Sequence, residues 1–115
     1  MTRERAVLDE VTRVPGVRSA LVVSQDDGLV VAESAVEGQD TEAVAALAAA
    51  LSRRLAGLSG AIGHPPLTLM LLQASRGQLF VSCGGNGLAF VAVADSDVNI
   101  GAVRLALLDA VGRLV

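Results

Sequence analysis

The sequence contains few of the side chains that metal sites and nucleophilic catalysis commonly use. Cys83 is its single cysteine, His64 is its single histidine, and lysine is absent. An intrachain disulfide and a metal cluster of the Cys-X-X-Cys kind are therefore excluded. We expect Cys83 to be a small buried residue within a strand, because free cysteine behaves as a small hydrophobe. We expect His64, directly before Pro65, to be an exposed residue of a connecting loop.

Aromatic residues and clustered charge are equally scarce. Aromatic side chains make up 2% of the chain, as two phenylalanines. The formal net charge is -3, and the nine basic residues, all arginines, are scattered. Nucleic-acid surfaces need clustered basic residues and commonly use aromatic platforms on which bases stack. The composition therefore argues against nucleic acid as a partner.

No apolar run is long enough for a membrane helix. The longest one, Ala43–Leu51, is far shorter than the ~20 residues that cross a bilayer. The first five residues mix both signs of charge and do not begin a signal peptide. We therefore expect a cytoplasmic protein without a membrane span.

Small and aliphatic side chains are abundant instead. The chain has 115 residues, 52% of them hydrophobic, and a mean hydropathy of +0.57. This length is most simply one domain, residues 1–115, which buries roughly two thirds of its unfolded surface. The high hydropathy predicts an aliphatic, alanine-rich core and further apolar contacts between copies of the chain.

The segment 41–62 predicts a long helix that is apolar or small on nearly every side. At about 100° per residue, one face carries Val44, Leu47, Ala48, Leu51, Leu55, Leu58 and Ile62. The opposite face carries Ala45, Ala46, Ala49, Arg53, Ala56, Gly57 and Gly60. A helix without a polar face is normally covered on both sides. We expect the small-residue face to point outward and a second copy of the chain to cover it.

The remaining pattern predicts seven further elements around this helix. Thr2 is a candidate N-cap of a first helix that ends near Val14, and Asp97 or Asn99 is a candidate N-cap of the last helix. Asp40 or Thr41 caps the long helix. The expected strands are Val17–Gln25, Leu29–Glu33, Leu67–Ala74, Gln78–Cys83 and Leu88–Ala94. The order is thus α-β-β-α-β-β-β-α.

The strand predicted at Leu67–Ala74 is apolar on both of its faces, so both sides of the sheet must be covered there. Hairpin connections favour an antiparallel sheet of five strands. We therefore predict an α/β (α+β) fold, a three-layer α/β/α sandwich, with the long helix on one face and the two terminal helices on the other.

Three segments also resemble a known family. The hairpin at 15–33, the alanine-rich run at 43–51 and the segment Gly101–Ala110 are similar, in this order, to those of the Roadblock / dynein light-chain family. The similarity spans essentially the whole chain and rests on apolar and turn residues, not on catalytic signatures. The resemblance implies a Roadblock/profilin-like fold. It also implies a homodimer in which the middle helix and the third strand pair with their own copies, joining two five-stranded sheets.

Carried over onto this sequence, that pairing implies an interface of Ala45, Ala46, Ala49, Arg53, Ala56, Gly57, Thr68, Leu69, Met70, Leu71 and Leu72. Prokaryotic members of the MglB type commonly bind or regulate small Ras-like GTPases, so the resemblance implies a GTPase partner in a signalling role. Arg53 and Arg54 are the candidate partner-facing residues, with solvated charges at the dimer rim as the alternative.

The sequence offers little support for catalysis. The turn at 84–87 is glycine-rich, but it lies between two predicted strands and lacks the Lys-Ser/Thr pair of a phosphate loop. Ser59, His64 and Asp95 are the residue types of a Ser-His-Asp catalytic triad, but the sequence lacks the spacing of a nucleophile elbow that would support one. The acidic pairs in turns lack the spacing of a calcium loop. We therefore expect no enzymatic activity, no metal and no cofactor.

Two other functions stay open beside the GTPase-binding scaffold. A small-ligand sensory module of PAS/profilin-like architecture would share the mixed layering, although the aliphatic core offers little aromatic or polar lining for a ligand. A hydrolase that uses His64 would lose its activity in a His64→Ala variant.

Overall fold

The computed structural model describes residues 3–35, 38, 40–63, 68–84 and 86–114. Its helices and strands have the predicted order. They are α1 (Arg3–Thr12), β1 (Val17–Ser24), β2 (Val30–Ala35), α2 (Thr41–Ala61), β3 (Leu69–Ala74), β4 (Gly77–Cys83), β5 (Leu88–Ala94) and α3 (Ile100–Leu114).

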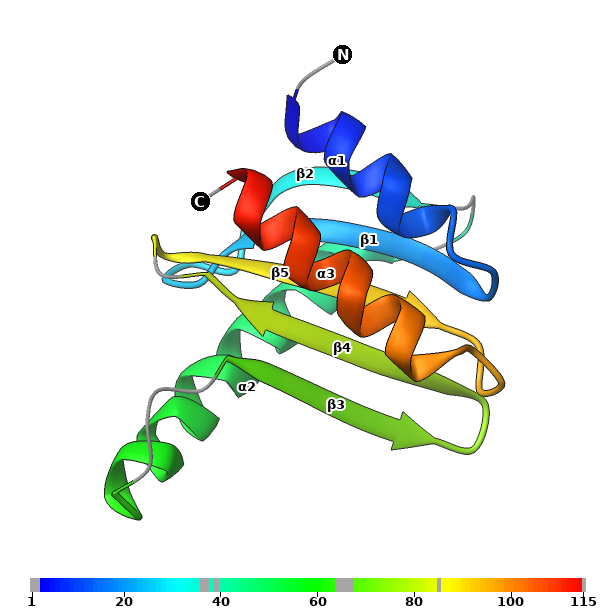
Figure 1. Cartoon of the computed structure of the whole chain (residues 1–115). Coiled ribbons are helices and arrows are strands. Elements are labelled where there is room, and N and C mark those ends of the chain that lie inside the picture. The colour runs from blue at the N-terminus through cyan, green and yellow to red at the C-terminus, as the bar shows by residue number, and fades with distance from the viewer. Residues whose placement is uncertain (1–2, 36–37, 39, 64–67, 85, 115) are drawn as a thin grey trace.

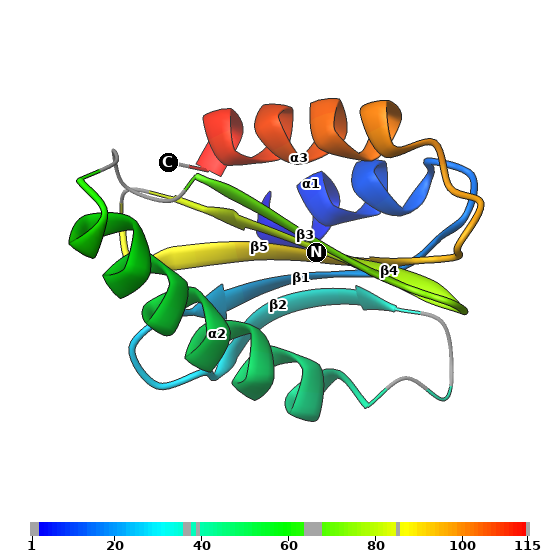
Figure 2. The same ribbon diagram turned by 90° about the horizontal axis from the view of Figure 1, so that it is seen from below.

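The five strands form one antiparallel sheet in the order β2-β1-β5-β4-β3, so β2 and β3 are its two edges. Helices α1 and α3 lie side by side on one face of the sheet, and α2 crosses the other face (Figure 1, Figure 2). This arrangement confirms the predicted three-layer sandwich. The β1–β2 pairing shifts register between Val22 and Val23, which places a β-bulge near the β2 edge.

The core between the sheet and the two terminal helices contains the bulky side chains. Phe80 and Phe90 are fully buried there, together with Leu8 of α1 and Leu107 of α3. Phe80 lies in β4 and Phe90 in β5. An ion pair also joins the two helices of this layer, because Arg113 of α3 contacts Glu10 of α1 at 2.6 Å.

The core under α2 is built differently, and it contradicts the prediction for this helix. Ala45, Ala48, Ala49 and Ser52 are the buried residues of α2, whereas Leu47, Leu58 and Ile62 are 71%, 56% and 58% exposed. The expectation that Ala45 and Ala49 point outward was therefore wrong. Ala45, Ala48 and Ala49 lie against the sheet. Val44, Leu51 and Leu55 are half-buried beside them, whereas Leu47, Leu58 and Ile62 lie on the outside.

The sheet surface beneath α2 explains this reversal. Leu21, Val91, Val81 and Met70 form a row across β1, β5, β4 and β3 in the pairing register, and all four belong to the core on this face. Because large side chains already fill the space above the strands, a helix can pack closely only with small residues beneath it. Alanines at i, i+3 and i+4 supply that surface.

The helix caps resolve two alternatives that the sequence left open. The Asp40 carboxylate accepts a hydrogen bond from the Ala43 backbone N–H at 3.1 Å, and the Asn99 side chain accepts one from the Ala102 N–H at 3.0 Å. Asp40 and Asn99 are thus the N-caps of α2 and α3. Helix α1 ends at Thr12, two residues earlier than predicted. Thr2 and Leu67 lie outside the described residues.

Candidate functional site

The outer flank of α2 is an exposed apolar surface. Leu47 and Leu58 lie on it with half-buried Leu51, and Ile62 extends it past the end of the helix. From Leu55 to the end of α2 no residue is buried, and in Figure 1 this end of the helix projects beyond the sheet. A helix end that exposes Leu58 and carries only half-buried or exposed residues is a surface that favours contact with another protein.

The open edge of β3 continues this surface. Met70 and Leu72 pair with Val81 and Leu79 on the side of the sheet that α2 covers, and Leu72 is exposed. Leu71 instead packs on the core beneath α1 and α3, so both faces of β3 are apolar, as predicted. We call the surface formed by Leu47, Leu51, Leu58, Ile62, Leu72 and the backbone edge of β3 the α2–β3 face, and Met70 is buried beneath it.

The structure divides the predicted interface residues into two groups. Ala45 and Ala49 are fully buried under α2 within one chain, so their side chains cannot reach a second copy. Ala46, Arg53, Ala56 and Gly57 are exposed on the helix, and Thr68 is exposed before β3. Leu69, Met70, Leu71 and Leu72 are distributed between the two faces of the edge strand.

Arg53 and Arg54 have different surroundings although they are adjacent. The Arg53 guanidinium donates hydrogen bonds to the backbone carbonyls of Gln25 and Asp26, the latter at 3.4 Å, and so ties α2 to the β1–β2 turn. Arg54 is exposed, and within the described residues it has no hydrogen bond or ion pair. Arg54 is therefore the arginine of this pair that remains available to a partner.

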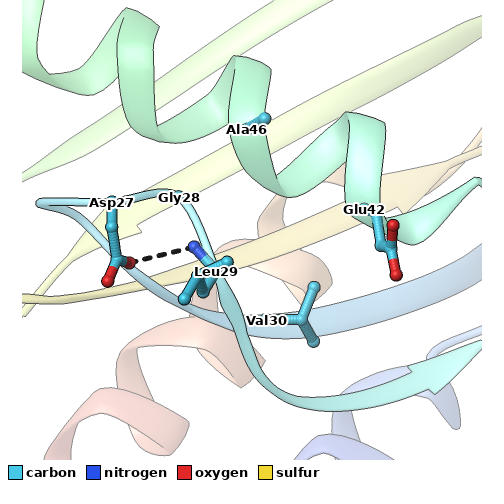
Figure 3. Close-up of a pocket in the computed structure, with 6 residues that line it drawn as sticks. All are labelled: Asp27, Gly28, Leu29, Val30, Glu42 and Ala46. Atoms are coloured by element: carbon cyan, nitrogen blue, oxygen red, sulfur yellow. Dashed lines mark hydrogen bonds between the residues drawn. The ribbon is translucent and has the colours of Figure 1, made fainter.

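A recess of about 490 Å³ lies between the β1–β2 turn and the first turns of α2. Figure 3 shows Leu29 and Val30 between the carboxylates of Asp27 and Glu42, with Asp27 accepting a hydrogen bond from the Leu29 N–H at 3.1 Å. Its remaining lining residues are Gly28 and Ala46. Aliphatic side chains and two carboxylates line the recess without any aromatic ring, so it lacks the usual lining of a small-ligand pocket.

A smaller recess of about 280 Å³ contains the free thiol. Cys83, Ser52 and Arg53 are among its lining residues. Cys83 is half-buried at the end of β4 rather than fully buried as predicted. Burial raises the pKa of the Cys83 thiol, and hydrogen bonds from Ser52 and Gln25 oppose this rise. A thiol with a raised pKa is a poor nucleophile at neutral pH.

The other candidate chemical groups are not assembled into a site. Asp95 forms an ion pair with Arg18 at 3.0 Å, and His64 lies outside the described residues. Among the residues with described positions, no group of three His, Cys, Asp or Glu side chains could hold a metal ion. The turn that begins at Gly84 joins β4 to β5, and the Gly84 N–H donates to the Leu88 carbonyl at 2.8 Å, as expected for a hairpin.

Sequence reasoning missed Leu47, Leu58 and Ile62 as outward-facing residues. Hydropathy alone favours burying leucine before alanine. The overlooked signal is the steric demand of the strands, because large side chains on the sheet leave little depth for leucines beneath the helix.

Within the described part of the chain, none of the helices combines the length and hydropathy of a membrane-crossing segment.

A family model described as the Roadblock/LC7 domain matches residues 4–94. A search among curated proteins finds no match.

Several solved structures share this fold. MglB of Myxococcus xanthus superposes with a TM-score of 0.90 at 23% identity, covering 99% of this chain and 93% of that one. An MglB described as having a tetrameric arrangement gives a TM-score of 0.88 at 27% identity, covering 97% and 85%. A Roadblock/LC7 domain from Streptomyces avermitilis gives 0.85 at 23% identity, covering 94% and 91%.

Proposed function

The chain belongs to the Roadblock/LC7 domain family, and from this premise we propose that it is a non-enzymatic, homodimeric regulator that binds a small Ras-like GTPase. The observation that carries the dimer is the α2–β3 face, where exposed leucines adjoin an unpaired strand edge. The GTPase partner follows from the resemblance to prokaryotic family members.

The α2–β3 face supports self-pairing for two physical reasons. An apolar edge strand left unpaired is an aggregation hazard, and pairing with its symmetry mate satisfies its backbone groups. The exposed side chains Leu47, Leu58 and Ile62 gain apolar contacts in the same step. Stable association typically buries about 800 Å² per partner, and a long helix together with a six-residue strand has the extent to provide it.

Substitution of Leu58 by Glu tests the dimer. Leu58→Glu places a carboxylate in the centre of the proposed interface, where burying an unpaired charge is costly. We expect the mass in size-exclusion chromatography with light scattering to fall from twice the chain mass to the chain mass at micromolar concentration.

The matched control is Leu29→Glu, which changes a leucine that is 64% exposed beside β2. This variant should stay dimeric. A Leu58→Glu protein that stays dimeric, or a Leu29→Glu protein that dissociates, contradicts the assignment of the interface.

The two adjacent arginines provide a test of the partner surface. We expect Arg54→Ala to weaken binding of a small Ras-like GTPase, purified and loaded with a non-hydrolysable GTP analogue, by about tenfold, because exposed arginines are frequent anchors of interfaces. Its unfolding midpoint should not change. Arg53→Ala should instead lower the free energy of unfolding by about 0.5–1.5 kcal/mol, because it removes hydrogen bonds that hold the β1–β2 turn.

The measurement is isothermal titration calorimetry with small Ras-like GTPases encoded in the same genome, and Arg76→Ala, in the β3–β4 turn, is the control. Absence of any binding by the unchanged protein at micromolar concentration removes the GTPase proposal. Equal affinities of the Arg54→Ala and unchanged proteins remove the role of Arg54.

A further inference from the structure

A second apolar surface lies on α3, on the opposite face of the sheet from α2. Leu105 and Leu108 are 70% and 48% exposed, and α3 forms the outside of its layer in Figure 2. Because residues three apart are neighbours on a helix, the two leucines form one continuous surface, which we call the α3 patch. Pairing through the α2–β3 face would leave this patch exposed.

The exposed residues of α3 have the spacing of a coiled-coil seam. Gly101, Leu105, Leu108 and Gly112 follow one another at intervals of four, three and four, which is the alternation of a and d positions in a heptad. All four are exposed. A Cβ placed on Gly112 would meet no atom within 4 Å, so the end of the seam leaves room for a neighbouring helix to approach closely.

The charges beside the patch are complementary to a second copy. Arg104 and Asp109 lie on opposite flanks of the two leucines, at the g and e positions of the heptad. In a parallel pair of helices a g residue faces the e residue five positions later in the partner. Arg104 of each copy would therefore face Asp109 of the other. In an antiparallel pair the same flanks meet, and this attraction is lost.

Both charged groups have capacity for such a contact. Within the described chain, Arg104 has no hydrogen bond or ion pair. Asp109 contacts Arg113 through Oδ2 at 3.2 Å, which leaves Oδ1 for a second cation.

We propose that the α3 patch binds α3 of a second copy of this chain in parallel orientation, through a twofold contact separate from the α2–β3 face. Two leucines per copy cover much less than the ~800 Å² per partner of a stable interface. The association is therefore weak, depends on concentration and adds to the dimer. It provides a route by which dimers join into larger assemblies.

Light scattering over a concentration series up to about 1 mM tests the contact. We expect the mass of the unchanged protein to rise above twice the chain mass, and Leu105→Glu to abolish this rise while leaving the dimer. Leu29→Glu should keep the rise. A mass that does not increase with concentration, or an increase that persists in Leu105→Glu, overturns the proposal.

This outcome is separable from failure of the proposed dimer. If the α2–β3 face did not dimerise, Leu58→Glu would leave the mass unchanged at low concentration, and the α3 contact alone would limit the mass to twice that of the chain. The Leu58→Glu protein, once monomeric, should still form a weak dimer at high concentration, and Leu58→Glu/Leu105→Glu should not.

An exchange of charges tests the parallel orientation and does not depend on a new charge within the apolar seam. Arg104→Asp and Asp109→Arg should each weaken the association by about twofold to thirtyfold, because each removes two exposed ion pairs. The double variant Arg104→Asp/Asp109→Arg should recover most of the affinity. Single variants without effect, or a double variant that remains weak, overturn the parallel arrangement.

Discussion

Cys83 illustrates how local surroundings set the chemistry of one side chain. It lies at the end of β4 in a recess next to Ser52 and Arg53. An arginine nearby would favour the thiolate, yet Arg53 donates to the carbonyls of the β1–β2 turn. Burial then dominates, and the pKa of Cys83 is raised above its ordinary value. The thiol is therefore kept in its neutral form.

We expect the native thiol to react with iodoacetamide more slowly at about pH 8 than the thiol of the urea-unfolded chain, because less thiolate is present. The neutral form is favoured in the folded state. The free energy of unfolding that depends on Cys83 is thus fully present below the pKa of the unfolded thiol and decreases as the pH rises toward the raised folded pKa.

Rates of alkylation measured across the alkaline range check this expectation, and Cys83→Ala should lose the corresponding alkaline decrease in stability. Equal rates in the native and unfolded chains would show that burial has no influence on the thiol.

At the scale of an element, the bounds of α2 could be predicted from the sequence, but its orientation on the sheet could not. Its bounds were predicted within one residue because Asp40 precedes it and the sequence continues after its end with Gly63 and the pair Pro65-Pro66. Its orientation was not, because both of its faces are apolar and the periodicity carries no information about which one meets the sheet. The decision depends on the height of the side chains on β1, β4 and β5, which belong to distant parts of the sequence.

An enlarged residue on each side of α2 tests this orientation. Ala49→Leu should lower the free energy of unfolding by about 1–3 kcal/mol, because the site is fully buried and overpacking forces neighbours to move. Ala43→Leu, at an exposed position of the first turn, should change it by less than about 0.5 kcal/mol. Chemical denaturation measures both values, and the reverse ranking would support the inward-facing leucines that hydropathy favours.

For the whole molecule, the order of elements and the three layers were predictable from the sequence. The turn residues separated the strands, and the two apolar faces of β3 required helices on both sides of the sheet. The position of β3 at an edge could not be derived from periodicity alone, because a strand that is apolar on both faces usually lies inside a sheet. An apolar strand at an edge together with exposed leucines on α2 means that the single chain leaves two apolar elements incompletely covered.

The opposite edge strand of the sheet, β2, has features that discourage pairing with another strand. The β-bulge between Val22 and Val23 disturbs the pairing of β2, and Glu33 places an exposed carboxylate on that strand. Bulges and charges of this kind discourage the addition of another strand. If two copies pair along β3, both edge strands of the merged sheet are β2 strands. Further copies of the chain then cannot readily extend the sheet. The chain can therefore keep one apolar, unpaired edge strand, β3, without forming fibrils by continued strand addition.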